Sequence, residues 1–403
     1  MSGPLQGVRV IELAHIMAGP VCGLMLADMG ADVIEVERRP GGDSTRGVVP
    51  PDVDGESAAF MMLNRGKRGL AVDLRDPRGV DVVRGLTLDA DVLIENFRVG
   101  TMERIGLGWE ALARANPRLV YCQITGFGRT GPFADRGGFD LIAQGYSGLM
   151  SVTGEGPGGE PMKVGAPVTD ITAGILAAFG VTAALFERER TGRGQLVDTS
   201  LYEAGITQTY WQSAIALASG VSPGPLGTAH PLAAPYQAFR TADGWINVGA
   251  SNEATWGRLA NAVQRPDLRN DARFATNADR MRHLGPLVEL LAPIFATRTT
   301  DAWLEALEQG GVPAGPVASI GEMLAHPQTR AREMVIEVEH SRLGPVRALG
   351  SPVKLSGSIP TEPRMGAPRL GEHTREVLEG LGLASPDVQD LIEAGVVSVA
   401  APG

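Results

Sequence analysis

The chain has 403 residues, of which 43% are hydrophobic and 20% are charged, so it can bury a large core and is not a disordered polypeptide. Its 36 basic and 46 acidic residues give a net charge of −10, which argues against nonspecific binding to nucleic acid or to an anionic membrane surface. Because one domain usually takes about 100–200 residues, we expect more than one domain.

The first third of the chain alternates between short apolar segments and helical ones. The pattern predicts strands over residues 8–13, 32–37, 69–73, 91–95 and 119–124, with helices between most of them. Strand–helix–strand order of this kind is typical of a parallel sheet covered by helices. The predicted fold class is therefore α/β.

The middle of the chain changes character. Residues 171–186 are uncharged and predict a buried helix, since a membrane-spanning helix needs about 18 or more apolar residues. A second helix is predicted over residues 198–220 and a Gly- and Pro-rich linker over 221–235. Residues 236–329 begin with a strand, a turn and a strand and continue with helices, which predicts a smaller α+β domain.

Cysteine and glycine patterns exclude several classes of site. Cys22 and Cys122 lie in apolar stretches, as buried thiols of a reduced cytoplasmic protein would. Neither cysteine nor histidine spacing matches a metal-ligand motif, so no metal site is predicted. Gly154-x-Gly156-x-x-Gly159 matches the dinucleotide fingerprint in form, but Pro157 and Pro161 interrupt the helix that should follow it. A nicotinamide-dependent dehydrogenase is therefore disfavoured.

Basic residues gather where the predicted strands end. The group comprises Arg38, Arg39, Arg46, Lys67, Arg68, Arg75, Arg98 and Arg104. Ligands of open α/β sheets bind at the carboxyl ends of the strands, and arginine binds phosphate with two parallel hydrogen bonds. From spacing alone, both a pocket for a phosphorylated ligand and an ordinary solvated surface stay open.

Asp170 stands immediately before the long uncharged run. Its place at the start of a predicted helix is typical of an N-cap residue. It would also suit a nucleophilic carboxylate, because the helix N–H groups and dipole would keep it ionised despite burial. The two interpretations are compatible.

The order and spacing of these segments resemble the family III CoA-transferases, the CaiB/BaiF group, along nearly the whole chain. The resemblance rests on the motifs Ala14-His15-Ile16-Met17-Ala18-Gly19-Pro20, Gly42-Asp43-Ser44-Thr45-Arg46, Asn64-Arg65-Gly66-Lys67-Arg68, Glu95-Asn96-Phe97, Thr125-Gly126-Phe127-Gly128, Phe139-Asp140-Leu141-Ile142-Ala143-Gln144 and Asp170-Ile171-Thr172-Ala173-Gly174.

The resemblance implies both architecture and site. It implies a large Rossmann-like CoA-binding domain from residues 1–220 and 330–403, with residues 236–329 as the small domain, in an interlocked homodimer. The catalytic aspartate falls on Asp170. The implied CoA-binding residues are Ile16, Arg38, Val72, Arg75, Asn96, Phe97 and Arg104. A possible substrate pocket comprises His15, Met17, Phe139 and Asp140.

The implied reaction moves CoA from an acyl-CoA donor to a carboxylate acceptor through an aspartyl anhydride and an aspartyl–CoA thioester. CoA is part of the substrate, and no permanently bound cofactor is expected. Met17 and Ala59 stand where the formyl-CoA branch of the family has polar residues. The segment from Gly227 to Phe239 is more similar to the succinate–hydroxymethylglutarate branch, so a short, dicarboxylic acid is the expected substrate.

Two alternatives are weighed against this activity. An acyl-CoA racemase of the same superfamily pairs the aspartate with a histidine base, and this chain has Phe139 at that position. A single aspartate cannot carry out two-base racemisation alone. A noncatalytic CoA-binding protein would not need a nucleophile, so the presence of Asp170 disfavours it.

Overall fold

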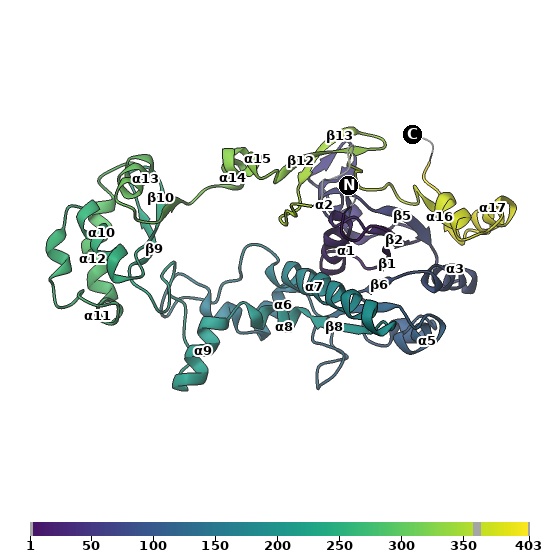
Figure 1. The fold of residues 1–403 in the computed structure, drawn as a ribbon, viewed down its shortest axis with the longest axis horizontal. Coiled ribbons are helices and arrows are strands. Elements are labelled where there is room, and N and C mark those ends of the chain that lie inside the picture. The colour runs from purple at the N-terminus through teal and green to yellow at the C-terminus, as the bar shows by residue number, and fades with distance from the viewer. Residues whose placement is uncertain (1–2, 358–363, 402–403) are drawn as a thin grey trace. The chain divides into compact units, whose positions relative to one another are not determined.

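The computed structural model describes residues 3–357 and 364–401. Two compact units make up the chain (Figure 1). The first unit comprises Met1–Gly148, Val164–Gln208 and Pro327–Gly403, and the second comprises Leu149–Lys163 and Thr209–His326. The backbone therefore passes between the units four times, after residues 148, 163, 208 and 326.

A seven-stranded sheet forms the centre of the first unit, in the order β14-β5-β2-β1-β6-β7-β8. Its strands are β1 (Arg9–Leu13), β2 (Asp32–Arg38), β5 (Arg68–Val72), β6 (Val92–Glu95), β7 (Val120–Thr125), β8 (Leu196–Ser200) and β14 (Val397–Ser398). All neighbours pair in parallel except β14, which runs antiparallel to β5. The mixed α/β fold expected from the sequence is confirmed.

Helices cover both faces of this sheet because its strands direct apolar residues to both sides. On β1, Val10 belongs to a core with α1 (Ala18–Asp28) and α7 (Val168–Thr191), whereas Ile11 belongs to the opposite core. The helices that contribute to the opposite core are α3 (Pro77–Leu88), α5 (Trp109–Ala115), α16 (Thr374–Gly380) and α17 (Ser385–Glu393). Cys22 and Cys122 are buried free thiols in the α1–α7 core, as expected.

The remaining elements of the first unit are short. They are η1 (Ser44–Gly47), β3 (Asp52–Val53), β4 (Glu56–Ser57), α2 (Ala58–Asn64), α4 (Thr101–Arg104), α6 (Asp140–Tyr146), α8 (Leu201–Thr207), α15 (Pro327–Ala331), β12 (Val335–His340) and β13 (Gly344–Leu349). Of these, α4 and α6 follow the loops that matter for the site.

Helices α1 and α7 lie side by side against the sheet (Figure 1). A Cβ atom on Gly174 would lie 2.6 Å from the Ala18 carbonyl oxygen and 2.7 Å from Val21, so only glycine allows this contact. The close approach fixes the first turn of α7, which carries Asp170, next to the first turn of α1.

Two expectations about this region need correction. Residues 196–200 form the edge strand β8, not the start of a helix, because they pair in parallel register with β7. The apolar run is not buried all round: α7 buries Ala173 and Ala177 but exposes Phe179 and Phe186. Within the described part of the chain, α7 is also the one helix long and apolar enough to cross a membrane by length and composition.

The second unit has its own core. A three-stranded sheet of β9 (Tyr236–Arg240), β10 (Trp245–Gly249) and β11 (Ala314–Pro316) packs with helices around Phe239, Phe295 and Trp303. Its helical segments are η2 (Leu149–Val152), α9 (Tyr210–Ser219), α10 (Glu253–Ala262), η3 (Pro266–Arg269), α11 (Asn277–Arg282), α12 (Leu284–Phe295), α13 (Thr300–Gln309) and α14 (Ile320–Ala325).

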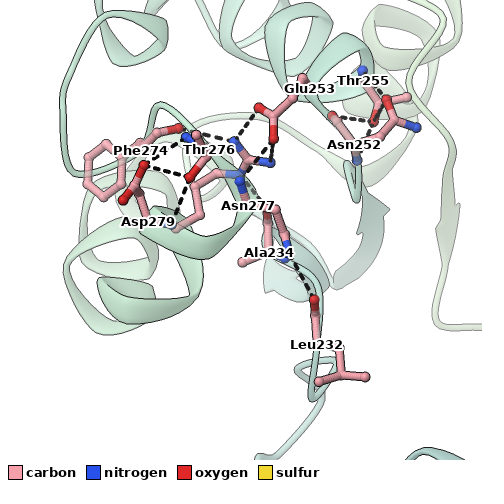
Figure 2. Close-up of polar contacts among 10 residues, drawn as sticks. Leu232, Ala234, Asn252, Glu253, Thr255, Phe274, Thr276, Asn277 and Asp279 are labelled. Carbon is pink, nitrogen blue, oxygen red and sulfur yellow. Dashed lines mark hydrogen bonds and ion pairs between the residues drawn. The ribbon is translucent and has the colours of Figure 1, made fainter.

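A polar network fastens the segment before β9 to the helices of this unit (Figure 2). Asn277 donates to the Leu232 carbonyl (2.9 Å) and accepts from the Ala234 N–H (3.1 Å). The fully buried Arg280 guanidinium donates to the Ala234 carbonyl (2.6 Å) and to Glu253 (2.9 Å). Asn277 and Arg280 thus satisfy both backbone groups of Ala234, which is fully buried.

The second unit begins earlier in the chain than the domain boundary expected from the sequence. Residues 149–163 and 209–220 cluster with it, although the sequence places them in the large domain. One reason is that the loop containing Gly154 packs on the Gly- and Pro-rich segment: a Cβ on Gly154 would lie 3.3 Å from Pro225. This loop is neither preceded by a strand nor followed directly by a helix, so it is no dinucleotide site.

Candidate functional site

The strand order creates a crevice beside the central strand β1. Chain connections leave β1 and β6 toward opposite sides of the sheet, and ligands bind at such a switch point, beyond the carboxyl ends of the strands. A cavity of about 320 Å³ opens there, and we call it the switch-point cavity. Its walls are the β1–α1 loop, the β6–α4 loop, the end of β7, the loop before α6 and Asp170.

Asn96 clamps the β1–α1 loop. Its Oδ1 accepts from the His15 N–H (3.1 Å) and its Nδ2 donates to the His15 carbonyl (2.8 Å). The ring of Phe97 lies 5.5 Å from that of His15. Burial lowers the pKa of His15, which favours the neutral imidazole. Three residues expected in the site are thus brought together at one wall of the cavity.

Ile16 adopts a backbone conformation that needs support. Its φ of 69° lies in the left-handed region, which β-branched residues rarely occupy and which costs about 1–3 kcal/mol. The Asp43 carboxylate accepts from the Ile16 N–H (3.0 Å) and holds it there. This conformation leaves the Ile16 side chain exposed at the cavity, where a ligand can contact it.

Asp43 is itself held by a buried ion pair. Its N–H donates to Glu37 Oε2 (2.9 Å), and the Arg46 guanidinium binds both oxygens of Glu37 at 2.7 Å. The same guanidinium lies 3.6 Å from the centre of the Phe60 ring. Arg46 therefore supports the site indirectly, by holding the Glu37 carboxylate that binds Asp43, and its guanidinium is not available to a ligand.

Asp170 lies in the first turn of α7 and lines the cavity. The expectation that it is the N-cap is wrong, since α7 begins at Val168 and Pro167 occupies the cap position. The capping carboxylate comes from Asp140, which accepts from the Thr169 N–H (3.0 Å) and hydroxyl (2.8 Å). No group of the described chain donates a hydrogen bond to the Asp170 carboxylate itself.

The electrostatics of Asp170 also differ from expectation. Burial, with a smaller contribution from the charge of Asp140, raises the pKa of Asp170 from 3.8 to about 6. Asp170 is nevertheless mostly ionised above pH 6, and its free lone pairs leave it able to attack an electrophile.

The loop before α6 forms another part of the cavity lining. It is folded around Phe127, whose ring contacts those of Phe133 (5.4 Å) and Tyr146 (5.3 Å). A Cβ on Gly138 would lie 2.5 Å from the Gly126 Cα, so this contact requires glycine. Phe139 follows at the cavity wall with 69% of its surface exposed.

Other expected site residues lie outside the cavity lining. The Val72 side chain is fully buried in the core of the sheet, and Asp140 is engaged with Thr169. Arg75 is exposed and bound to Asp73. Met17, by contrast, lines the cavity at the start of α1.

The structure divides the basic residues of the strand ends into two groups. Half of them are neutralised by an acid partner, as where Lys67 is buried against Glu12 and Arg68 pairs with Asp32. Within the described ranges, four of the expected group have no acid partner. One of them, Arg39, is held by the Ser398 hydroxyl and the Gly395 carbonyl. The other three keep guanidinium donors free for an anion. Arg38 donates only to the Gly42 carbonyl, Arg104 only to the Thr101 hydroxyl, and Arg98 has no side-chain hydrogen bond.

Sequence reasoning missed the residues that support the cavity from below. Burial raises the pKa of Glu95 to about 8, and its carboxyl accepts from the Phe97 N–H (2.7 Å). Lys67, Glu12 and Asn64 form a second buried cluster under α1. The role of Glu95 could have been found from the sequence, because an acidic residue at the end of an apolar strand is unusual. The Lys67 contacts could not, because they join segments that are distant in the sequence.

Within the described ranges, no group of acidic, histidine or cysteine side chains is placed to hold a metal ion.

Comparison with known proteins gives a consistent result. Residues 5–374 match the model of CoA-transferase family III. The chain is 42% identical to a succinate–glutarate CoA-transferase of Agrobacterium fabrum, over 94% of this chain and 96% of the relative. It is 36% identical to the human succinyl-CoA:glutarate CoA-transferase, over 98% and 90%. A solved CAIB/BAIF family protein from Brucella suis is similar at a TM-score of 0.83 and 39% identity, over 94% of this chain and 100% of that protein.

Proposed function

Because the chain belongs to CoA-transferase family III and is therefore a CoA-transferase, we propose that it moves CoA between short dicarboxylic acids. Similar proteins are named for succinate with glutarate, mesaconate or D-citramalate. The observation that carries the proposal is the position of Asp170, which lines the switch-point cavity with a carboxylate free of hydrogen-bond donors.

The first half-reaction loads CoA onto the enzyme. An Asp170 oxygen attacks the donor thioester carbonyl and the C–S bond breaks. CoA departs as its thiolate, and an acyl–aspartyl anhydride remains on the enzyme. The thiolate then attacks the aspartyl carbonyl of the anhydride. The donor acid departs as its carboxylate, with one oxygen from Asp170, and an aspartyl–CoA thioester remains.

The second half-reaction repeats these steps with the acceptor. Its carboxylate attacks the aspartyl thioester and expels CoA thiolate, which gives a new anhydride. The thiolate attacks the acceptor carbonyl, a new acyl-CoA forms, and Asp170 is regenerated as carboxylate. Acyl groups of similar energy are exchanged, so covalent splitting and proximity supply the rate enhancement.

Three neighbours support this chemistry in the proposal. The Gly137 and Gly138 N–H groups, at the cavity wall, donate to no acceptor in the described chain and can stabilise oxyanions. Asp140 holds the first turn of α7 through Thr169 and so fixes the carboxylate of Asp170 in place. In the free enzyme its charge opposes ionisation of the nucleophile.

For CoA we propose Arg38 and Arg104 as phosphate partners, because both keep free guanidinium groups at the carboxyl edge of the sheet. Ile16, Asn96 and Phe97 form the wall along which the thioester end enters. Contributions from Val72 and Arg75 stay predictions, and that of Val72 is confined to its backbone because its side chain is fully buried.

We also propose that the protein works as an interlocked homodimer. Helix α7 exposes Phe179 and Phe186, each at 71%, and α9 exposes Leu217 at 88% and Tyr210 at 74%. Apolar surface of this kind is typical of an interface. Threaded chains cannot separate without unfolding, so light scattering should give a dimer at the lowest measurable concentration. A monomer on dilution would argue against threading.

The test of the reaction class is chemical trapping. Enzyme incubated with succinyl-CoA and then hydroxylamine should gain a hydroxamate at Asp170, detected by mass spectrometry, because hydroxylamine cleaves both the anhydride and the thioester. The Asp170→Asn variant should still bind CoA but should gain no hydroxamate. The racemase alternative predicts instead deuterium exchange at the α-carbon of a branched acyl-CoA, without an adduct. Exchange without adduct would reject the proposal.

A further inference from the structure

Of the three arginines that keep free guanidinium groups, Arg98 alone lines the switch-point cavity together with Asp170. Arg38 and Arg104 lie outside its lining. We propose that Arg98 binds the second carboxylate of the acid whose first carboxylate reacts at Asp170. Arg98 is then the residue that selects dicarboxylic over monocarboxylic acids. This inference rests on the proposed function.

The backbone fixes where Arg98 stands. It follows the Asn96 clamp by two residues, and its carbonyl accepts from the Thr101 N–H (3.0 Å), at the start of α4. Its guanidinium lies against Gly137, which also lines the cavity: a Cβ there would lie 3.3 Å from Nη2 and 3.5 Å from Nε. Glycine at 137 thus leaves room for the guanidinium, and its planar fork is free for a carboxylate.

The charges in the cavity separate the two ends of the substrate. The pKa of Asp170 is raised by burial and by Asp140, and no cation is among the causes of that shift. Asp170 comes from α7 and Arg98 from the β6–α4 loop, and in the described residues no hydrogen bond or ion pair joins their side chains although both line the cavity. A short diacid bound between them would place its far carboxylate at Arg98 and its reacting carboxylate at Asp170.

Arg136 is the other cation of the cavity wall, and it is less suited to this role. Its Nη1 donates to the Tyr146 hydroxyl (3.2 Å), and its guanidinium lies 3.9 Å from the centre of the Phe133 ring. Both partners are neutral, but together they fix the group against the aromatic cluster of the loop before α6. The side chain without such partners is Arg98.

The experiment compares two acceptors of equal chain length, glutarate and valerate, which differ by one terminal carboxylate. With a shared succinyl-CoA donor, the acceptor kcat/KM of a ping-pong reaction reports the acceptor half-reaction alone. Arg98→Met should lower the glutarate-to-valerate ratio of kcat/KM by about 10- to 100-fold, the effect of one charge-assisted contact. Arg98→Lys keeps the charge but not the planar fork, so its glutarate-to-valerate ratio should lie between those of wild type and Arg98→Met.

Arg118→Met is the matched control, because Arg118 precedes β7 at the opposite edge of the sheet and pairs with Glu189 on the surface. It should leave the ratio unchanged. Calorimetry should show wild-type CoA affinity for Arg98→Met, and circular dichroism should show its fold. If that variant does not fold, the ratio for Arg98→Lys decides.

Two results would overturn the inference while wild-type enzyme transfers CoA to glutarate. One is an unchanged ratio in both Arg98 variants. The other is an equal loss with both acids together with weaker CoA binding, which would make Arg98 a phosphate contact. Wild-type enzyme that transfers CoA to neither acid would instead reject the dicarboxylate function itself.

Discussion

The ionised Asp170 carboxylate should lower the stability of the folded protein, and replacing it with a neutral side chain should raise that stability. Burial and the charge of Asp140 raise the pKa of Asp170 from 3.8 to about 6, and one pKa unit corresponds to about 1.4 kcal/mol. Ionised Asp170 thus costs up to about 3 kcal/mol, which its partial contact with water reduces to about 2 kcal/mol. Asp170→Asn keeps the size, removes the charge, and should raise the free energy of unfolding by that amount at pH 8.

The sign of the pH dependence makes this prediction specific. Because the folded state has the higher pKa, the penalty is complete above pH 6 and disappears as the pH falls toward 4, where both folded and unfolded chains are protonated. Urea unfolding of wild type and Asp170→Asn across this range should show the two curves converging. Asp89→Asn, at an exposed position after α3, is the control and should show no such trend. A constant difference, or a less stable Asp170→Asn at pH 8, would refute the reasoning.

Three further predictions follow from the site. The kcat/KM for acyl-CoA should rise about tenfold per pH unit up to a plateau above pH 6, because Asp170 must be ionised to attack; a limb near pH 4 would contradict the raised pKa. Arg38→Ala and Arg104→Ala should each weaken CoA binding by about 10- to 100-fold in calorimetry, and unchanged affinity in both would exclude them as phosphate partners. Asn96→Ala removes both contacts to the His15 backbone and should raise the KM for acyl-CoA while lowering stability by about 1–3 kcal/mol; a lower stability with an unchanged KM would show that the clamp is structural alone.

Local pattern was enough to predict the strands that lie at the centre of the sheet. β1, β2 and β6 each contain a short run of buried apolar residues that reach both faces of the sheet, and such a run predicts a strand directly. The edge strand β8 was missed because Leu196–Ser200 is only partly buried and carries Asp198 in its middle. Its conformation comes from pairing with β7, a contact that no window of local sequence contains.

The candidate site divides in the same way. Asp170 and the loop residues His15 to Met17 were predictable, because they stand at the ends of apolar segments and carry the family pattern. The Asp43 contact that holds Ile16, and the Asp140 cap of α7, join segments about 30 residues apart. The roles of these two aspartates depend on folded geometry, so sequence spacing gave neither of them.

The fourfold passage of the backbone between the two units constrains how the protein can be recombined with its relatives. Exchanging the gene fragment for residues 209–326 would leave residues 149–163 of the recipient in place, facing a foreign partner segment around Pro225. Exchanging residues 149–326 as one block would carry α7 and Asp170 along with the second unit. Neither swap transfers the second unit alone and intact. Any property encoded in that unit should therefore pass between lineages together with the catalytic helix, or through matched changes in both of its segments.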